Sequence, residues 1–329
     1  MQSTAATSST DSESTQGEHD LGPLAWVLDE LRKSLDGAVK ALHRFVRDAE
    51  LARDSDLATL DTSALRIARQ QLHQASGALD MVGMQPPAFI LRAMEAAVQK
   101  FVQRPELCTD EAAGAIERMS FALSEYLDSV LAGKPASAVE LFPQYRDMQA
   151  LVGGDPVHPA DLWPLERRLL EPADSTKPIQ AMQYGTETRA LLDQNLLRIV
   201  KTGSATASRR MSDLCLSLAV SQTQPSSRAF WKIAAGFFEA LGQGLLTVDV
   251  YVKRAASRIL LQYTTLARDE SQEVPPYVLQ ELLFFCAQAH PKPQTQVPAL
   301  SAVRVAFALD DYQVVDYQAA RFGRFDPAL

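Results

Sequence analysis

The sequence predicts an all-α protein made of two tandem helical bundles, and three observations predict it. Apolar residues recur at steps of three and four through most of the 329-residue chain, which is the period of an amphipathic helix. Residues that favour helix starts and stops lie at the ends of these apolar segments. A stretch rich in proline and glycine, residues 152–178, interrupts the pattern and divides the chain into two helical regions.

Four substantial helices with short connections are expected in the first region, followed by a short fifth helix. Their apolar positions favour helices over 22–48, 61–83, 86–101, 109–133 and 137–151. Asp61 and Thr109 are good N-cap residues, and Gly133 is a natural terminator. Ser137 with Glu140 forms a capping box. Because short connections make sequential helices neighbours, an antiparallel four-helix bundle is the economical arrangement.

The second region is again helical and predicts a second bundle. Its expected helices cover 186–201, 205–220, 228–246, 250–269, 277–289 and 301–309. The segment 228–246 is very apolar, and we expect its aromatic side chains in the core. Asp249 suits the N-cap of the next helix, and Pro275 and Pro276 suit the start of the following one.

The domain division follows from composition. Residues 1–20 are rich in serine, threonine and acidic residues, which is typical of a disordered tail. The expected order is then a first bundle over 21–152, a linker over 153–180 and a second helical domain over 181–329. In the linker, Trp163 and Leu165 are expected to dock on one domain, and His158 is expected in a turn. Asp326-Pro327 is a good helix start close to the last residue, so the second domain is expected to be cut short.

The most informative motif lies in the segment Gln70 to Gly83, where a histidine is followed by two glycines. His73 lies at the border of an apolar stripe, where an imidazole is half packed and half exposed to water. The stripe consists of Leu72, Ala75, Leu79 and Val82. Gly77, one turn after His73, costs a helix interior about 1 kcal/mol relative to alanine. We therefore expect that Gly77 opens the surface beside His73 to a partner protein or a phosphoryl group.

This arrangement resembles the histidine-phosphotransfer (HPt) signature, H-x-x-K-G-x-x-x-x-x-G. His73, Gly77 and Gly83 match the signature position by position, and Ser76 replaces its lysine. In that family the histidine accepts a phosphoryl group, and the lysine holds the phosphoryl oxygens by charge. The resemblance implies an HPt-like first bundle with His73 as phosphoacceptor. Ser76 would then donate a weak hydrogen bond to the phosphoryl group, and Gln70 could hydrogen-bond a ring nitrogen.

Several segments, taken in order, are similar to the N-terminal region of ChpA/PilL-type hybrid CheA-like histidine kinases, and equally to the scaffold protein FimL, which shares that region. They read LGPLAWVLDELRKSLDGAVKALHRFVRDAE, RIARQQLHQASGALDMVG, AFWKIAAGFFEAL, YVKRAASRILLQY and LLFFCAQA. The second bundle would then be a related or degenerate one, with Trp231 where a histidine would stand. An indole nitrogen has no available lone pair, so Trp231 cannot accept phosphate.

This wider resemblance implies a role in the chemosensory pathway that governs type IV pili and twitching motility. The partners it implies are a response-regulator receiver domain, a CheA-type kinase core in cis or in trans, and a polar hub protein. It also implies a cytoplasmic location, including the cell pole. The chain would be either a separate scaffold or the N-terminal part of a longer hybrid histidine kinase.

Other functions have little support in the sequence. The net charge of −8 argues against general nucleic-acid binding, and the lack of an 18-residue apolar run predicts no transmembrane helix. No P-loop, ATP-lid glycine box or other catalytic motif occurs, so we expect no enzyme activity in this chain. Cys108, Cys215 and Cys286 lie far apart without metal-ligand spacing. They are expected to be buried free thiols, and no metal or cofactor is expected.

Two functions remain open. In the first, His73 takes a phosphoryl group from a kinase core and passes it to a receiver aspartate, which requires a partly exposed, neutral imidazole. In the second, the bundles form a non-catalytic scaffold that binds a receiver or hub protein through an exposed helical face. The retained histidine favours transfer, and the missing lysine at Ser76 favours the scaffold. An ordinary surface histidine is the competing interpretation, and a buried His73 ring would exclude transfer.

Overall fold

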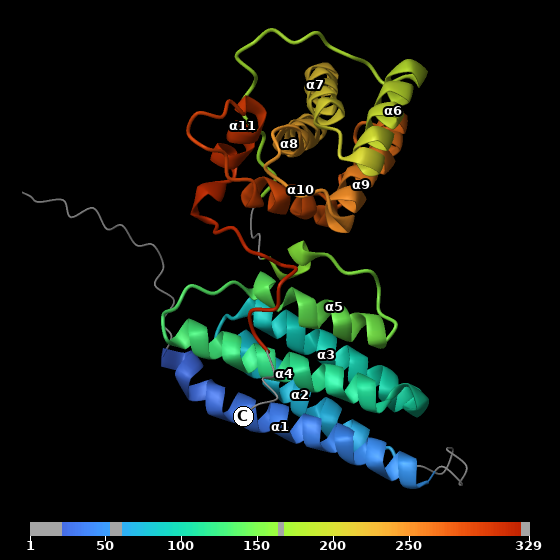
Figure 1. Cartoon of the computed structure of the whole chain (residues 1–329), viewed down its shortest axis with the longest axis vertical. Helices are drawn as coiled ribbons and strands as arrows, with labels where there is room; N and C mark the ends of the chain where they lie inside the picture. Colours follow the sequence, from blue (N-terminus) through green and yellow to red (C-terminus); the bar gives the residue numbers. More distant parts are fainter. Residues whose placement is uncertain (1–21, 53–60, 164–167, 324–329) are drawn as a thin grey trace, which may run out of the picture.

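The structure, a computed structural model, describes residues 22–52, 61–163 and 168–323. These residues form eleven α-helices and several short 3-10 helices, without a β-strand among them. The expected all-α fold is confirmed for this part of the chain. Helices α1–α5 and α6–α11 form two units that lie one above the other along the long axis of the molecule (Figure 1). The expected tail over 1–20, Leu165 and Asp326-Pro327 lie outside the described residues.

The first unit contains four long helices and a short fifth helix. They are α1 (Gly22–Leu51), α2 (Ser63–Met81), α3 (Gln85–Gln103), α4 (Asp110–Leu131) and α5 (Phe142–Leu151). Helix α1 packs against α2 and α4, α2 packs against α3, and α5 packs against α4. The residues that fill the shared core are those of the expected apolar stripes, including Leu42, Leu72, Met94, Ile116 and Leu123.

Local capping determines where several helices begin. Thr109, Asp249 and the pair Ser137 and Glu140 make the expected capping hydrogen bonds. The segment after Ser137, however, starts as a 3-10 helix, Ala138–Leu141, and becomes α-helical at Phe142. Helix α2 begins at Ser63 with Thr62 at the N-cap, one residue later than expected. The Asp61 carboxylate still accepts the Ser63 backbone N–H, at 2.8 Å.

The second unit is built around α8. Its helices are α6 (Thr186–Thr202), α7 (Ala205–Ser221), α8 (Pro225–Gly242), α9 (Val250–Arg268), α10 (Pro276–Gln288) and α11 (Pro298–Ala306). Helix α8 packs against α7, α10 and α11, and fourteen of its eighteen residues are buried, which makes it the core helix of this unit. Gly236 allows the close approach of α11, because a Cβ there would lie 2.9 Å from Val303 Cγ2.

Two helix starts in the second unit differ from the prediction. Helix α8 begins at Pro225 instead of Arg228, and α11 begins at Pro298 instead of Ser301. In both cases a proline, interpreted from sequence as part of a loop, occupies the first turn. A first-turn proline loses no helical hydrogen bond, since its missing N–H would have had no partner within the helix.

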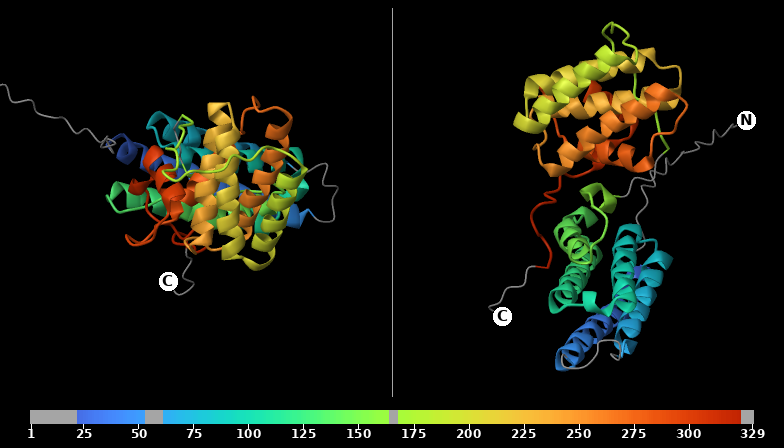
Figure 2. Two further views of the ribbon diagram at one scale, coloured as in Figure 1. Left: turned by 90° about the horizontal axis from the view of Figure 1, so that it is seen from above. Right: turned by 90° about the vertical axis from the view of Figure 1, so that its right-hand side faces the viewer.

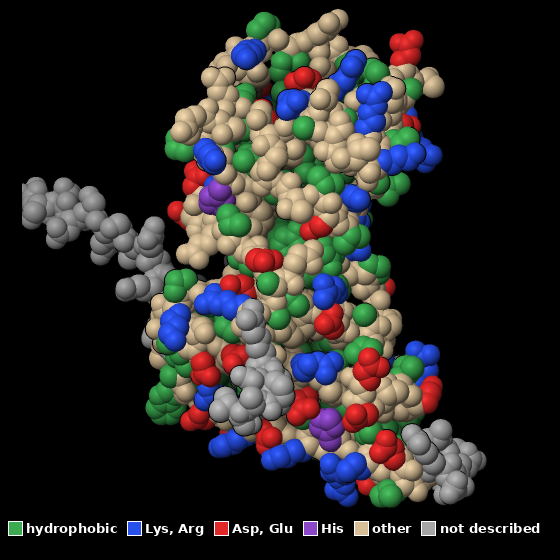
Figure 3. Space-filling view, viewed as in Figure 1, with side chains coloured by type: hydrophobic (Ala, Val, Ile, Leu, Met, Phe, Trp, Pro, Cys, Tyr) green, Lys and Arg blue, Asp and Glu red, His purple; other side chains and the backbone are tan. Residues whose placement is uncertain are grey.

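The connection between the units is ordered around His158 and Trp163. His158 is 2 % exposed and is the N-cap of a 3-10 helix, Pro159–Leu162: its Nδ1 accepts the Ala160 N–H at 3.0 Å. This agrees with the expected turn. Trp163 docks on the second unit, as expected, with its ring against Phe284 and Tyr312. Figure 3 shows hydrophobic side chains gathered where the two units meet, which is the waist of the molecule. Charges of both signs are mixed over the surfaces of the two units. The division at 152/153 and 180/181 stays a prediction.

Candidate functional site

His73 lies on the outer surface of α2, and 66 % of its side chain is exposed. Leu72, Ala75 and Leu79, the neighbours on the apolar stripe, are buried in the core. The helical period therefore places the backbone of His73 firmly in the bundle while its ring projects outward. A macromolecular partner can therefore reach the imidazole. The ring is not buried, so burial does not exclude phosphotransfer.

The imidazole is oriented by a carboxylate from the next helix. His73 Nδ1 lies 3.2 Å from Oε2 of Glu95 on α3, and Glu95 is mostly buried. This hydrogen bond favours the tautomer with the proton on Nδ1, which leaves the lone pair on Nε2. The basic nitrogen of the ring is then the one opposite the Glu95 contact.

Two arginines flank the histidine along the α2–α3 pair. Arg69, one turn before His73, donates to Gln99 at 2.7 Å. Arg92 contacts both carboxylate oxygens of Asp80 at 2.8 Å. Both guanidinium groups are about half exposed. Both are also paired with a carboxylate, since Arg69 lies 4.0 Å from Glu95 and Arg92 binds Asp80, so the row around His73 carries charges of both signs.

Sequence reasoning missed Glu95, Arg69 and Arg92, although a signal existed. The two helices form an antiparallel hairpin, so residues whose numbers have nearly the same sum face each other. The contacts 69–99, 73–95 and 80–92 follow this rule. Polar residues at 92, 95 and 99, spaced by three and four beside the apolar stripe of α3, would have indicated such a row.

The two glycines of the motif have different roles. Gly77 is exposed, and a Cβ built there would meet no atom within 4 Å. Close packing within the protein therefore does not explain this glycine, and its expected role in opening the surface beside His73 stays a prediction. Gly83 has a φ of +74° and forms the turn between α2 and α3, so its left-handed backbone accounts for it.

Neither Ser76 nor Gln70 is the recorded partner of the His73 ring. Ser76 is buried, and its hydroxyl donates to the backbone carbonyl of His73 at 3.0 Å. Its hydroxyl is thus bound to its own helix, and the expected hydrogen bond to a phosphoryl group stays a prediction. Gln70 is exposed one turn before His73, but the partner of the ring Nδ1 is Glu95.

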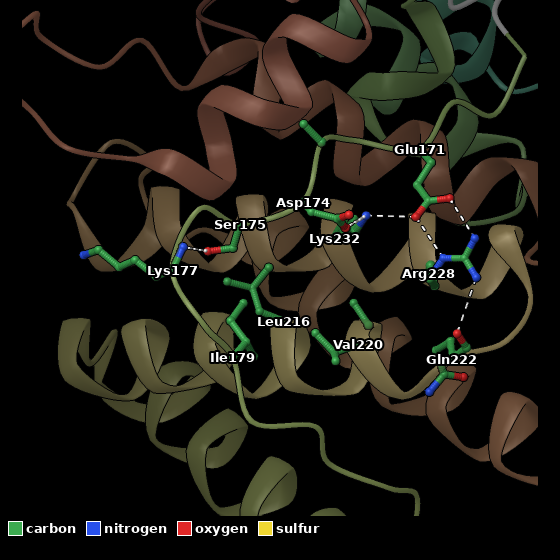
Figure 4. A pocket seen from close by; sticks show the side chains of 12 residues that line it. Glu171, Asp174, Ser175, Lys177, Ile179, Leu216, Val220, Gln222, Arg228 and Lys232 are labelled. Carbon is green, nitrogen blue, oxygen red and sulfur yellow. Dashed lines mark hydrogen bonds and ion pairs between the residues drawn. The ribbon is translucent and has the colours of Figure 1, made fainter.

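A second surface feature lies on the other unit, where the extended segment 168–180 crosses α7 and α8 (Figure 4). It borders an open cavity of about 620 Å³. Glu171 accepts from Arg228 at 2.9 Å and from Lys232 at 2.8 Å, and Lys232 also contacts Asp174 at 2.6 Å. These four charged groups are therefore paired with one another, and they fasten the segment to α8.

The charges in this cavity stabilise each other. The hydrogen bond from Arg228 lowers the pKa of Glu171, with a further contribution from Lys232. Burial disfavours the charge on Lys232, but hydrogen bonds to Asp174 and Glu171 outweigh it and raise its pKa. Trp231, between the two cations in sequence, is fully buried and donates from Nε1 to Tyr184 Oη at 2.8 Å. It is a core residue.

Groups that could support other chemistry are not arranged for it. Cys108, Cys215 and Cys286 are buried as expected, and burial raises the pKa of all three thiols, to about 12 for Cys108 and Cys286. The reactive thiolate is therefore disfavoured. No group of three or more His, Cys, Asp and Glu side chains suited to a metal ion occurs among the described residues. None of the described helices is both long and apolar enough to span a bilayer.

The fold and this surface define a class: an all-helical protein of two units, with an exposed imidazole on a charged pair of helices. Residues 178–320 match the family model of the FimL scaffold protein second domain, which confirms the expected resemblance to FimL over the second unit. The first unit lies outside this match, so its likeness to the HPt region of ChpA/PilL-type kinases stays a prediction. Neither the curated proteins nor the solved structures contain a match to the chain.

Proposed function

We propose that this chain is a scaffold in a type IV pilus chemosensory pathway, which brings signalling proteins together and has no enzyme activity of its own. The observation that carries the proposal is the match of residues 178–320 to the second domain of the FimL scaffold protein. The proposed partners are a response-regulator receiver domain, a CheA-type kinase core and a polar hub protein. The chain would act in the cytoplasm, and at the cell pole when bound to the hub protein.

The proposed docking face is the outer surface of α2 and α3 around His73 and Gly77. Gly77 leaves room for a partner backbone or side chain to approach the imidazole closely. Arg69 and Arg92 give the face two half-exposed cations. Each arginine is paired with a carboxylate of the same face, Arg69 with Glu95 at 4.0 Å and Arg92 with Asp80 at 2.8 Å, so the proposed docking depends on the open surface at Gly77 and not on an excess of positive charge.

Filling the space at Gly77 is expected to abolish docking without harming the fold. Because the position is open and glutamine is a better helix former than glycine, Gly77→Gln should leave stability unchanged or raise it by about 0.5–1 kcal/mol. The added side chain would occupy the approach to His73. We expect at least a tenfold loss of affinity for a receiver domain of the pathway, measured by calorimetry with the purified chain.

The matched control is Ser257→Gln, which places the same side chain on an exposed position of α9 in the other unit. It should bind the receiver domain like the wild type. If Gly77→Gln retains wild-type affinity, or if both variants lose it equally, the α2–α3 face is not the docking site.

Phosphotransfer through His73 is the second function, and the geometry of the ring favours it. The Nε2 lone pair would attack the γ-phosphorus of ATP in a kinase core, so that an N–P bond forms and the bond to the β,γ-bridging oxygen breaks, releasing ADP. Glu95 would stabilise the positive charge that develops on the ring, through its contact with Nδ1. A receiver carboxylate oxygen would then attack the phosphorus and release the imidazole.

Incubation of the chain with a CheA-type kinase core and labelled ATP tests this second function. Transfer at His73 predicts acid-labile label in the wild type, none in His73→Gln, and slower labelling in Glu95→Gln with unchanged circular dichroism. Equal labelling of the wild type and His73→Gln, or no labelling of either, would exclude transfer at this residue. If neither protein is labelled, the docking proposal still stands, because receiver binding is measured without phosphate.

A further inference from the structure

The last described residues return from the second unit to the first. After α11 the chain runs as an extended segment along the waist and descends beside α4 and α5, as two views of the molecule agree (Figures 1 and 2). Its end, Arg321-Phe322-Gly323, contacts α4, α5 and the 3-10 helix Ala138–Leu141, which lie 178 to 198 residues earlier in the sequence. Three successive residues of the segment are held there by three different kinds of contact.

Arg321 is held by charge. Its Nη1 donates to both carboxylate oxygens of Glu140 at 2.8 Å. Glu140 is mostly buried, and it is already fixed by the capping box with Ser137. The guanidinium group therefore meets a carboxylate whose position does not depend on the segment. A charge-assisted contact of this kind selects a basic side chain by its charge.

Phe322 is held by burial. The side chain is 5 % exposed, and its ring packs edge-on against Tyr126 of α4 with the centroids 5.9 Å apart. Its backbone carbonyl accepts from Gln144 Nε2 of α5 at 2.5 Å. An aromatic side chain is thus selected by the pocket while the backbone is fixed beside it.

Gly323 is held by shape. Its φ is +69°, a conformation that side chains other than glycine rarely adopt, and a Cβ there would lie 2.9 Å from the Cβ of Ala122. Its N–H donates to Glu125 Oε2 of α4 at 2.6 Å. Backbone conformation and lack of space both require glycine at this position.

We propose that the surface formed by α4, the 3-10 helix and the start of α5 is a recognition site for an Arg-Phe-Gly peptide, and that residues 321–323 of the same chain occupy it. The receptor residues are Ala122, Glu125, Tyr126, Glu140 and Gln144. This site is on a different part of the first unit from His73 and needs neither phosphate nor a receiver. Its occupant is a separable ligand joined to the second unit, and its release would free one of the attachments between the units.

The test uses the full chain and a labelled peptide with the sequence of residues 317–323, Tyr-Gln-Ala-Ala-Arg-Phe-Gly. In the wild type the chain's own segment occupies the site, so the peptide should bind weakly. In a chain with Phe322→Ala the segment no longer competes well, and the peptide should bind at least tenfold more tightly. A peptide with alanine in place of the glycine should bind the Phe322→Ala chain with at least tenfold lower affinity. The same Phe322→Ala chain should be cleaved faster by trypsin after Arg321.

Further variants keep the test decisive. Adding Glu125→Ala to the Phe322→Ala chain should weaken peptide binding again, because it removes the acceptor of the Gly323 N–H. If Phe322→Ala disturbs folding, as judged by circular dichroism, Gly323→Ala in the chain serves in its place. Equal peptide affinity for the wild type and the segment variants, or indifference to the glycine, would overturn the proposal. Light scattering tests whether the segment binds a second copy of the chain. A dimer that is lost in Phe322→Ala would show this, and it would contradict the proposal that the segment occupies the site of its own chain.

Discussion

Trp231→Ala is expected to lower the free energy of unfolding of the second unit by about 3–5 kcal/mol. The indole is fully buried in α8, it packs against Phe230 and Tyr263, and its Nε1 donates to Tyr184. Alanine leaves a cavity in the most deeply buried helix of this unit, and the Tyr184 hydroxyl loses a donor. Since domains are stable by about 5–15 kcal/mol in total, the loss is a large part of the stability. Urea titration followed by far-ultraviolet circular dichroism measures it.

Two variants show whether the loss arises from the cavity. Trp231→Phe keeps an aromatic ring but removes the donor, so it should cost less than Trp231→Ala. Trp26→Ala removes the same side chain from α1, where it is 89 % exposed, and should change stability by no more than about 0.5 kcal/mol. A loss below about 1 kcal/mol for Trp231→Ala would contradict the assignment of α8 as the core of the unit.

Acidification is expected to destabilise the protein through His158. Burial, with the nearby charges of Arg258 and Arg254, lowers the pKa of His158 to about 3. The unfolded chain binds a proton at this residue near pH 6.5, so it holds more protons than the folded chain between pH 6.5 and about 3. Stability from this group is therefore present above pH 6.5 and is lost as the pH falls. The expected loss between pH 7 and pH 4.5 is about 2.5 kcal/mol.

His158→Asn is the matched control for this pH dependence. Asparagine can cap the 3-10 helix but does not titrate, so its unfolding free energy should fall less steeply than that of the wild type in urea titrations from pH 7 to 4.5. In both proteins the Asp161 carboxyl raises the unfolding free energy as the pH falls, because burial raises its pKa. Parallel curves for the two proteins would show that His158 is protonated without loss of the fold.

Helix positions were predictable from the sequence where the determinant is local. Thr109, Ser137 and Asp249 cap helices through hydrogen bonds to residues two or three positions away, and such contacts can be inferred from spacing. The starts at Pro225 and Pro298 were missed because proline suits both a loop and a first helical turn. Burial of the apolar stripes followed directly from their period.

The candidate site was predictable in part. The exposure of His73 and the open space at Gly77 follow from their places on the helix. The burial of Ser76 did not follow from the motif: three residues after His73 it falls beside the core, and its hydroxyl donates to a carbonyl of its own helix. The contact of His73 with Glu95 and the contact of Arg321 with Glu140 join residues 22 and 181 positions apart. Such contacts depend on how helices pair, which no local pattern contains.

The central position of α8 has a consequence for synthesis on the ribosome. This helix ends at Gly242, but α11, which covers one of its faces, is complete only at Ala306. At 5–20 residues per second, the nascent chain carries that apolar face uncovered for roughly 3–13 s. During this interval the growing polypeptide is a natural client for a chaperone, and mutations that slow the closure by α10 and α11 would reduce the yield of protein before they alter any finished molecule.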